Sequence, residues 1–331
     1  MKREGDLWQR FLAWGLLAEG STRPAAIMRM GIMALVWAKW AEDFALFHQR
    51  SVVGHLINAS AFASTIAFFV GAFTRFSGAW ASLSLLTAYG YFGLHLGMRQ
   101  AFVHHHTRLL LVTTVLVALM PSGRSLSFDR YRAVTRAARE GQPPPPERGP
   151  LWAQRLLAIQ VSLLYFFTAG DKLRPSFLSG DRLEQIYAAV YGGPDFSAWF
   201  GYRPLVVASA IATVAIEYAL AFGLWVPRWR RVLIPLGVAF HVVLYYTLPI
   251  STFTATMCLL YLAFLDPDRV HATIDALLGH GQPAARQAQA SSSERKAAEG
   301  PEASAARQAQ ASSGELKRAA EGSAAPAPSA T

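Results

Sequence analysis

The sequence predicts an all-α fold: a polytopic membrane helix bundle of about eight spans, followed by a disordered C-terminal tail. Of the 331 residues, 53% are hydrophobic and 16% are charged, whereas a soluble domain carries about 25% charged residues. The apolar residues gather in runs of roughly 20, the length needed to cross a bilayer. After about residue 280 the chain consists mainly of alanine, serine, glutamine and charged residues without an apolar stripe, which is typical of disorder.

The apolar runs predict the individual spans, with boundaries open by about two to four residues. The first run carries charged residues near its ends, and the fourth is short. Only the turn at Pro249 separates the last two, so seven spans is the alternative. The predicted spans are 25–46, 54–73, 78–97, 106–121, 152–171, 204–226, 231–248 and 250–266.

Three segments lie outside these spans. Residues 1–24 predict an amphipathic cytoplasmic N-terminal segment that lies on the membrane surface and lacks the pattern of a cleavable signal peptide. Residues 25–270 form the transmembrane domain, and residues 271–331 form the tail. Between spans five and six, Asp181–Tyr191 has apolar residues at helical spacing, which predicts an amphipathic helix across the mouth of the bundle.

Arginine-rich loops set the predicted orientation. The formal net charge is +10, and basic cytoplasmic loops explain it better than nucleic-acid binding, so no nucleic acid is expected among the partners. Residues 122–150 and the turn 227–231 are the most arginine-rich connections. We therefore expect a multi-pass protein of the cytoplasmic membrane, in contact with membrane lipids and with both termini in the cytoplasm. This orientation places Lys172 at the outer face.

Lys172 is the foremost candidate for chemistry. It follows the apolar run of span five, and charge at the edge of a membrane helix is costly enough that it often has a function. One interpretation is an anchor that extends its ammonium to the interface. The other is a base, because desolvation disfavours the charged form and a neutral amine accepts protons. Asp171 would oppose the second role if it stabilised the ammonium charge.

Histidines and a glutamate supply the other candidates. His104, His105 and His106 cannot share one helix face, because successive residues turn by about 100°, and no cysteine or carboxylate completes a metal site, so none is predicted. His106 is either a polar residue at the interface or a donor to a developing anion. Glu217 and His241 lie mid-span, where ionisable residues often pair. A Glu217–His241 pair is one interpretation, and a ligand or proton path is the other.

Three motifs resemble those of the HTTM (horizontally transferred transmembrane) family, which includes the membrane half of vitamin K-dependent gamma-carboxylases. The run Tyr165-Phe-Phe-Thr-Ala-Gly-Asp-Lys-Leu173 resembles the family's Tyr-Phe, Gly and Lys-Leu signature. The run from His105 to Leu110 is similar to its Asn-His-x-x-Leu-Leu element, with His105 in place of the asparagine. Phe240-His241 before an apolar run resembles its late histidine-containing helix. The resemblance covers roughly residues 20–270.

The resemblance implies a mechanism and a cofactor. In the carboxylases, the lysine matching Lys172 deprotonates vitamin K hydroquinone, and oxygenation of the quinol creates a strong base. That base removes a proton from the gamma carbon of a peptide glutamate, and carbon dioxide adds to the carbanion. The histidine matching His106 stabilises this carbanion. The resemblance thus implies a reduced quinone (menaquinone or vitamin K hydroquinone) as cofactor, bound near Tyr165, Glu217 and His241, and a secreted peptide or protein as partner.

Two departures from carboxylation remain in view. The carboxylases continue into a large extracytoplasmic domain, whereas the low-complexity tail follows here. The leading hypothesis is therefore an outward-facing pocket for a quinol or lipid, with carboxylase-like, quinol-dependent lyase chemistry as its extension. The alternatives are a non-enzymatic accessory or immunity protein, and a small-solute transporter that uses Glu217 and His241. The hydropathy shows no inverted repeat of the kind many transporters have.

Overall fold

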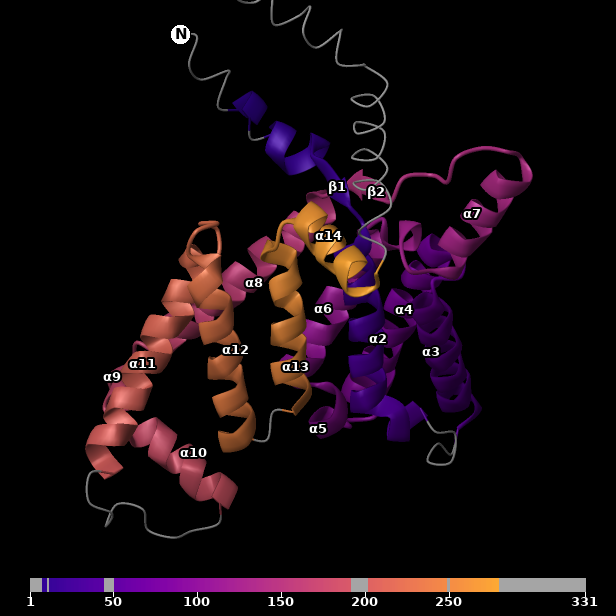
Figure 1. Ribbon diagram of the computed structural model, residues 1–331. Helices are drawn as coiled ribbons and strands as arrows, with labels where there is room; N and C mark the ends of the chain where they lie inside the picture. Colours follow the sequence, from indigo (N-terminus) through magenta and orange to yellow (C-terminus); the bar gives the residue numbers. More distant parts are fainter. Residues whose placement is uncertain (1–7, 11, 45–50, 192–201, 249–250, 280–331) are drawn as a thin grey trace, which may run out of the picture. The chain divides into compact units, whose positions relative to one another are not determined.

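The computed structural model describes residues 8–10, 12–44, 51–191, 202–248 and 251–279, and all structural statements concern these residues (Figure 1). The chain divides into two units, Met1–His271 and Ala272–Thr331. Every feature discussed below lies in the first unit. The predicted tail beyond residue 279, the first seven residues and the turn at Pro249 lie outside the described residues.

Helices account for nearly all of the described chain, so the predicted all-α class is confirmed. The long helices are α2 (Arg23–Phe44), α3 (Val52–Val70), α4 (Thr74–Ala88), α6 (His105–Leu119), α8 (Trp152–Asp171), α11 (Tyr202–Gly223), α12 (Arg230–Thr247) and α13 (Ser251–Leu260). Shorter elements are η1 (Ala13–Leu17), η3 (Tyr89–His95), α5 (Arg99–Phe102), η4 (Ser122–Arg124), α7 (Phe128–Arg139), α9 (Pro175–Leu178), α10 (Asp181–Tyr191), η6 (Tyr261–Phe264) and α14 (Pro267–Leu277).

Each of the eight predicted spans coincides with one long helix, and the amphipathic helix predicted at Asp181–Tyr191 is α10. Two of the described helices, Val52–Val70 and Tyr202–Gly223, are both long and apolar enough to cross a membrane. Two shorter segments, His105–Leu119 and Thr252–Phe264, are also apolar. The number of helices that cross the bilayer is therefore taken up under the proposed function.

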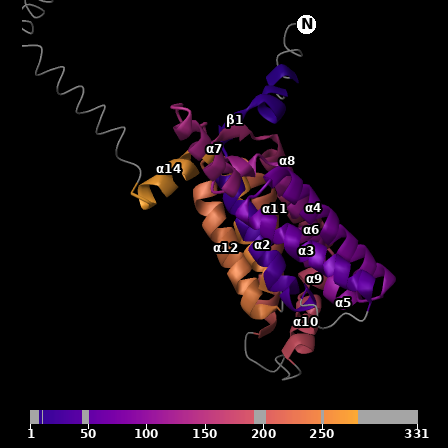
Figure 2. The same ribbon diagram turned by 90° about the vertical axis from the view of Figure 1, so that its right-hand side faces the viewer.

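Helix α2 lies at the centre of the packing. It contacts α3, α6 and α13, and its side chains Met28, Ile32, Val36 and Trp40 are almost fully buried. In two views at right angles, the long helices run alongside one another (Figures 1 and 2). In both views α5 and α10 lie towards one end of these helices, and α7 lies towards the other. Because α6 follows α5, and α8 leads into α9 and α10, the start of α6 and the end of α8 belong to the same end.

The arginine-rich connection 122–150 contains structure that the sequence did not predict. Its last residues form strand β2 (Arg148–Pro150), which pairs antiparallel with strand β1 (Glu19–Ser21). Strands of three residues are too short for an alternating pattern to be read. Arg29, which is fully buried in α2, donates to the carbonyls of Ser122 at 2.6 Å and Leu126 at 2.5 Å. A charge inside α2 is thus explained by the backbone carbonyls that it binds.

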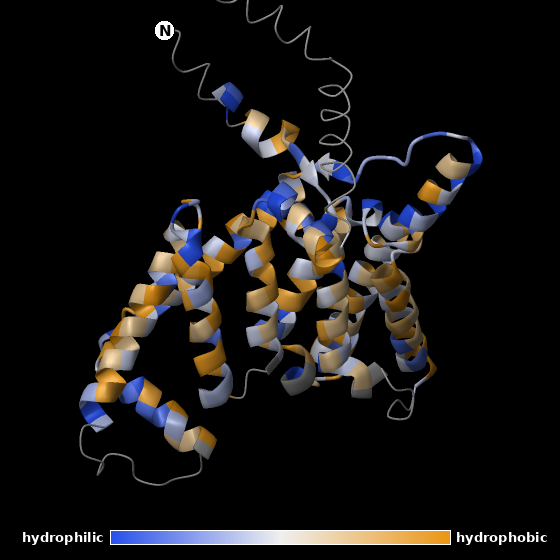
Figure 3. Ribbon diagram, in the orientation of Figure 1, coloured by the Kyte–Doolittle hydropathy of each residue, from blue (hydrophilic) through white to orange (hydrophobic). Residues whose placement is uncertain are grey.

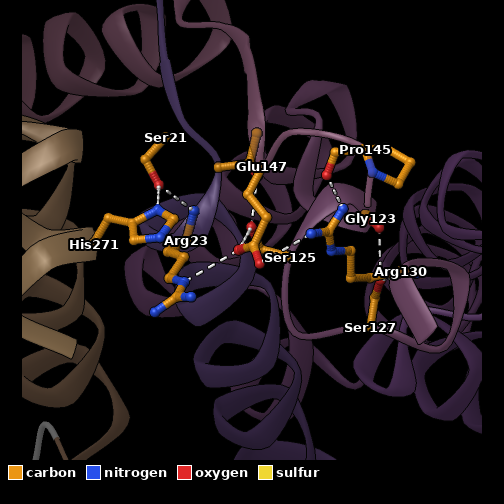
Figure 4. A network of polar contacts seen from close by, with 10 residues as sticks. Ser21, Arg23, Gly123, Ser125, Ser127, Arg130, Pro145, Glu147 and His271 are labelled. Carbon is orange, nitrogen blue, oxygen red and sulfur yellow. Dashed lines mark hydrogen bonds and ion pairs between the residues drawn. The ribbon is translucent and has the colours of Figure 1, made fainter. Parts of the chain in front are cut away.

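Glu147 holds this connection to the N-terminal strand (Figure 4). Its carboxylate accepts hydrogen bonds from Ser125 Oγ at 2.7 Å and from Arg23 Nε at 3.1 Å, and lies 3.5 Å from a nitrogen of Arg130. Burial alone would raise the pKa of Glu147, but the hydrogen bonds from Ser125 and Arg23 and the two arginine charges hold it below its ordinary value. The network stabilises the folded state only while Glu147 is ionised.

Replacement of Glu147 by glutamine is expected to destabilise the protein at pH 7 by about 1–2 kcal/mol, because hydrogen bonds to a charged partner are lost. A carboxyl whose pKa is lowered by folding stabilises above its ordinary pKa of about 4.3, and this contribution disappears as the pH falls through the lowered value. The melting temperatures of the wild type and Glu147→Gln should therefore converge below about pH 4. Glu140→Gln, at an exposed position just after α7, is the control and should match the wild type at both pH values.

Candidate functional site

Lys172 and Glu217 form an ion pair between α8 and α11. Lys172 caps the C-terminal end of α8, and its Nζ donates to Glu217 Oε1 at 2.6 Å and to Oε2 at 2.8 Å. The lysine side chain is 27% exposed and the glutamate side chain is 8% exposed. A buried carboxylate is costly without a partner, so Lys172 provides the charge that makes Glu217 tolerable at this position.

Asp171 does not hold the charge of Lys172. Its carboxylate pairs with Arg174 at 2.8 Å, and both of these side chains are about three-quarters exposed. The sequence analysis left the role of Asp171 open, and the structure gives the partnership with Lys172 to Glu217. Two close helices make this possible. Gly170 leaves room for Tyr218, whose hydroxyl lies 3.6 Å from the position a β-carbon would take.

The predicted pair of Glu217 with His241 is wrong. His241 Nε2 lies 2.7 Å from the hydroxyl of Tyr165, and the same hydroxyl lies 2.7 Å from that of Tyr261. All three side chains are almost completely buried. Because a phenol has a single proton to donate, Tyr165 accepts from one neighbour when it donates to the other. Tyr165, His241 and Tyr261, referred to below as the tyrosine–histidine cluster, thus form one hydrogen-bonded chain.

His106 lies beyond this cluster, behind an aromatic ring. Phe253 meets the His106 ring edge-on at 5.5 Å between centroids and the His241 ring at 5.7 Å. The Nδ1 atoms of His106 and His241 are both buried and have no hydrogen-bond partner among the described residues. Nor does any hydrogen bond or ion pair in the described part of the chain join His106 to Lys172. The structure therefore associates His106 with His241 rather than with Lys172.

An open groove of about 500 Å³ runs along one face of α8 up to Lys172. Leu163, Leu164 and Phe167 supply apolar walls, and Asp171 and Lys172 stand at its charged end. At the other end lies Gln160, whose side-chain oxygen is buried without a hydrogen-bond partner in the described structure. Buried polar atoms are normally satisfied, so this oxygen is available to a ligand in the groove.

The site has the means to hold and transfer a proton but not to bind a metal. The described residues contain no group of three histidine, cysteine or carboxylate side chains placed to hold a metal ion, consistent with the prediction that none is bound. Lys172 offers an ammonium proton, and Glu217 offers two oxygens within hydrogen-bond reach of it. A proton shared between these groups can move without leaving the protein.

Sequence reasoning missed Tyr261 and the true partner of Glu217. Tyr261 lies in an aromatic-rich run where nothing distinguishes it from packing residues. The partnership had a usable signal: Lys172 and Glu217 are the charged residues of two adjacent apolar helices, and such residues tend to pair. Choosing His241 as the partner required two mid-span positions to lie at the same depth. The 20-residue length of α8 instead brings its last turn level with Glu217.

These features define a membrane-associated helical protein, with apolar helices and an ion pair buried between two of them. The sequence model described as HTTM domain matches residues 29–269, which is well over half of the chain. The chain therefore belongs to the HTTM family, and the resemblance inferred from its motifs is confirmed. No curated protein and no solved structure matches the chain at a significant level.

Proposed function

We propose that this chain is an integral protein of the cytoplasmic membrane whose eight long helices cross the bilayer, and that the groove beside Lys172 opens outward and binds a reduced quinone or a lipid of similar shape. The observation that carries the proposal is the position of Lys172, whose ammonium borders an apolar groove while it is paired with a buried carboxylate. Both termini would lie on the cytoplasmic side.

The surface of the long helices supports the membrane location. Large apolar side chains on their outer faces are more than half exposed, for example Leu56 on α3, Leu83 on α4, Phe222 on α11 and Val243 on α12. Exposed apolar surface of this kind is typical of contact with lipid. Figure 3 shows hydrophilic residues concentrated on α7 and the loop after it, away from the long helices. That end would face the cytoplasm, where arginine-rich loops collect.

The groove fits a quinone in shape and chemistry. Its walls suit an apolar ring, the free oxygen of Gln160 can accept a hydrogen bond, and Lys172 lies at the opposite end. Ligand sites commonly combine mostly apolar walls with a few polar groups that fix orientation. When bound, a reduced quinone would supply a ring hydroxyl that can be deprotonated.

Lys172 and Glu217 would act together on that hydroxyl. Glu217 can take a proton from the Lys172 ammonium, because its oxygens lie 2.6 Å and 2.8 Å from Nζ. The neutral amine left behind is a base placed at the groove. The tyrosine–histidine cluster lies against the inner face of α8, where it supports that helix. His106, with its unused Nδ1, is proposed to stabilise a developing anion if turnover extends to carboxylation of a secreted peptide.

Quinol-dependent turnover is expected to be lost in Lys172→Ala and equally in Lys172→Arg. Arginine preserves the charge and the pairing with Glu217 but does not lose its proton at accessible pH, so Lys172→Arg separates base chemistry from folding. The measurement is epoxidation of a menaquinone-type quinol by the purified chain in nanodiscs. Undiminished epoxidation in Lys172→Arg would exclude Lys172 as the base.

Two exposed apolar residues provide a matched test of binding itself. Phe167 is 66% exposed and lines the groove at Lys172, whereas Leu83 is 65% exposed and lines a groove of about 290 Å³ between α3 and α4 that contains no charged residue. Phe167→Ser is expected to weaken quinol binding about tenfold, from lost apolar contact, and Leu83→Ser should leave it unchanged. Equal effects of both variants would point to partitioning into the surrounding lipid or detergent and against a site.

A further inference from the structure

A second groove, between α11 and α12, lies at the opposite end from Lys172. It has a volume of about 330 Å³ and is lined by Ala219, Phe222, Gly223, Arg228, Trp229, Val232 and Leu233. Gly223 allows the close approach of the two helices, because a β-carbon there would lie 2.2 Å from Leu233. Apart from Arg228 the lining is apolar, as a site for a hydrocarbon chain requires.

The connection between these helices carries positive charge that the protein does not neutralise. The guanidinium of Arg228 lies 5.8 Å from the centre of the Trp229 ring, and neither Arg228 nor Arg231 takes part in an ion pair of the described residues. Arg230 is used differently, because its Nε donates to the Leu224 carbonyl at 2.7 Å. The uncapped start of α12 adds a partial positive charge at the same place.

We propose that this groove binds one anionic phospholipid, with an acyl chain between α11 and α12 and the phosphate at Arg228. An apolar groove that ends at an unpaired arginine complements a molecule that is apolar along its length and negative at its head. Basic pockets between membrane helices on the cytoplasmic side bind such headgroups, and the exposed Trp229 is a residue favoured at that depth. The proposal rests on the membrane location proposed above and not on the quinone site.

Native mass spectrometry of the full chain in detergent tests this site. Phosphatidylglycerol titrated against the wild type should give a bound adduct at lower concentration than phosphatidylcholine, and inorganic phosphate should not compete. Arg228→Gln is expected to weaken phosphatidylglycerol binding about fivefold, because one arginine near the headgroup contributes roughly that factor. Ala219→Phe, which fills the groove, should weaken it at least as much.

Arg132→Gln is the matched control. Arg132 also lies 5.8 Å from an aromatic ring, that of Phe73, and belongs to the same arginine-rich end, but it lines no groove among those of the described residues. Its replacement should leave binding within twofold of the wild type. Equal losses in Arg132→Gln and Arg228→Gln, or equal binding of the two phospholipids, would overturn the proposal. Lys172→Arg should retain the adduct, so failure of the quinone proposal leaves this result readable.

Discussion

Lys172→Met is expected to destabilise the protein by about 3 kcal/mol, measured as a lower melting temperature or denaturation midpoint in detergent. The variant leaves the carboxylate of Glu217, which is 8% exposed, without its only ion-pair partner among the described residues. Removing one member of a buried pair typically costs about 3–5 kcal/mol. We expect the lower part of this range because Lys172 is itself 27% exposed, so water reaches the pair.

The exposures also predict an asymmetry between the two partners. Glu217→Leu should cost less than Lys172→Met, because the ammonium left behind can extend along its flexible stem to water or headgroups. The double variant Lys172→Met/Glu217→Leu should recover most of the loss, since replacing a whole buried pair by apolar residues is often nearly neutral. A double variant no more stable than Lys172→Met would show that the two residues are not energetically coupled.

Gly237→Ala is expected to cost about 2–3 kcal/mol and to disrupt the tyrosine–histidine cluster. A β-carbon at Gly237 would lie 2.1 Å from the Tyr261 hydroxyl and 2.6 Å from the ring carbon that bears it. The ring cannot move aside cheaply, because it is 2% exposed and its hydroxyl is bonded to Tyr165. Overpacking typically costs about 1–3 kcal/mol, and loss of the buried hydrogen bond adds to it.

Gly90→Ala is the matched control, since no atom lies within 4 Å of the β-carbon that it would add. Gly90 lies in the helical segment η3, where alanine is intrinsically better than glycine by about 0.5–1 kcal/mol. We therefore expect Gly90→Ala to be neutral or slightly stabilising in the same thermal assay. A Gly237→Ala protein as stable as Gly90→Ala would mean that Tyr261 is free to move and that the cluster is not rigid.

The positions of the helices could be predicted because the pattern that forms them is local. Runs such as 204–226 and 231–248 contain enough apolar residues to define a helix from composition alone, and α11 and α12 lie there. The amphipathic spacing at Asp181–Tyr191 was likewise sufficient. Local patterns failed for β1 and β2, because a pairing between residues 19–21 and 148–150 depends on segments that are distant in the sequence.

The candidate site shows the same division. Lys172, Glu217, His241, Tyr165 and His106 were all singled out from the sequence, because charged and polar groups within apolar helices are conspicuous. Their partners were not predictable, since each hydrogen bond depends on the rotation and depth of two helices. A small axial shift between α8 and α11 would have placed Glu217 beside Tyr165 and Lys172 beyond reach.

By itself, the sequence determined the helical class, the family and the residues that stand out chemically. Hydropathy and motif spacing are properties of the chain alone, and the burial of apolar surface turns them into helices in any compact arrangement. The tertiary structure alone decided that Glu217 partners Lys172, that His241 joins Tyr165 and Tyr261, and that a groove ends at Lys172. Ion pairs and hydrogen bonds act over about 3 Å, and only the packing of helices on one another sets distances of that size.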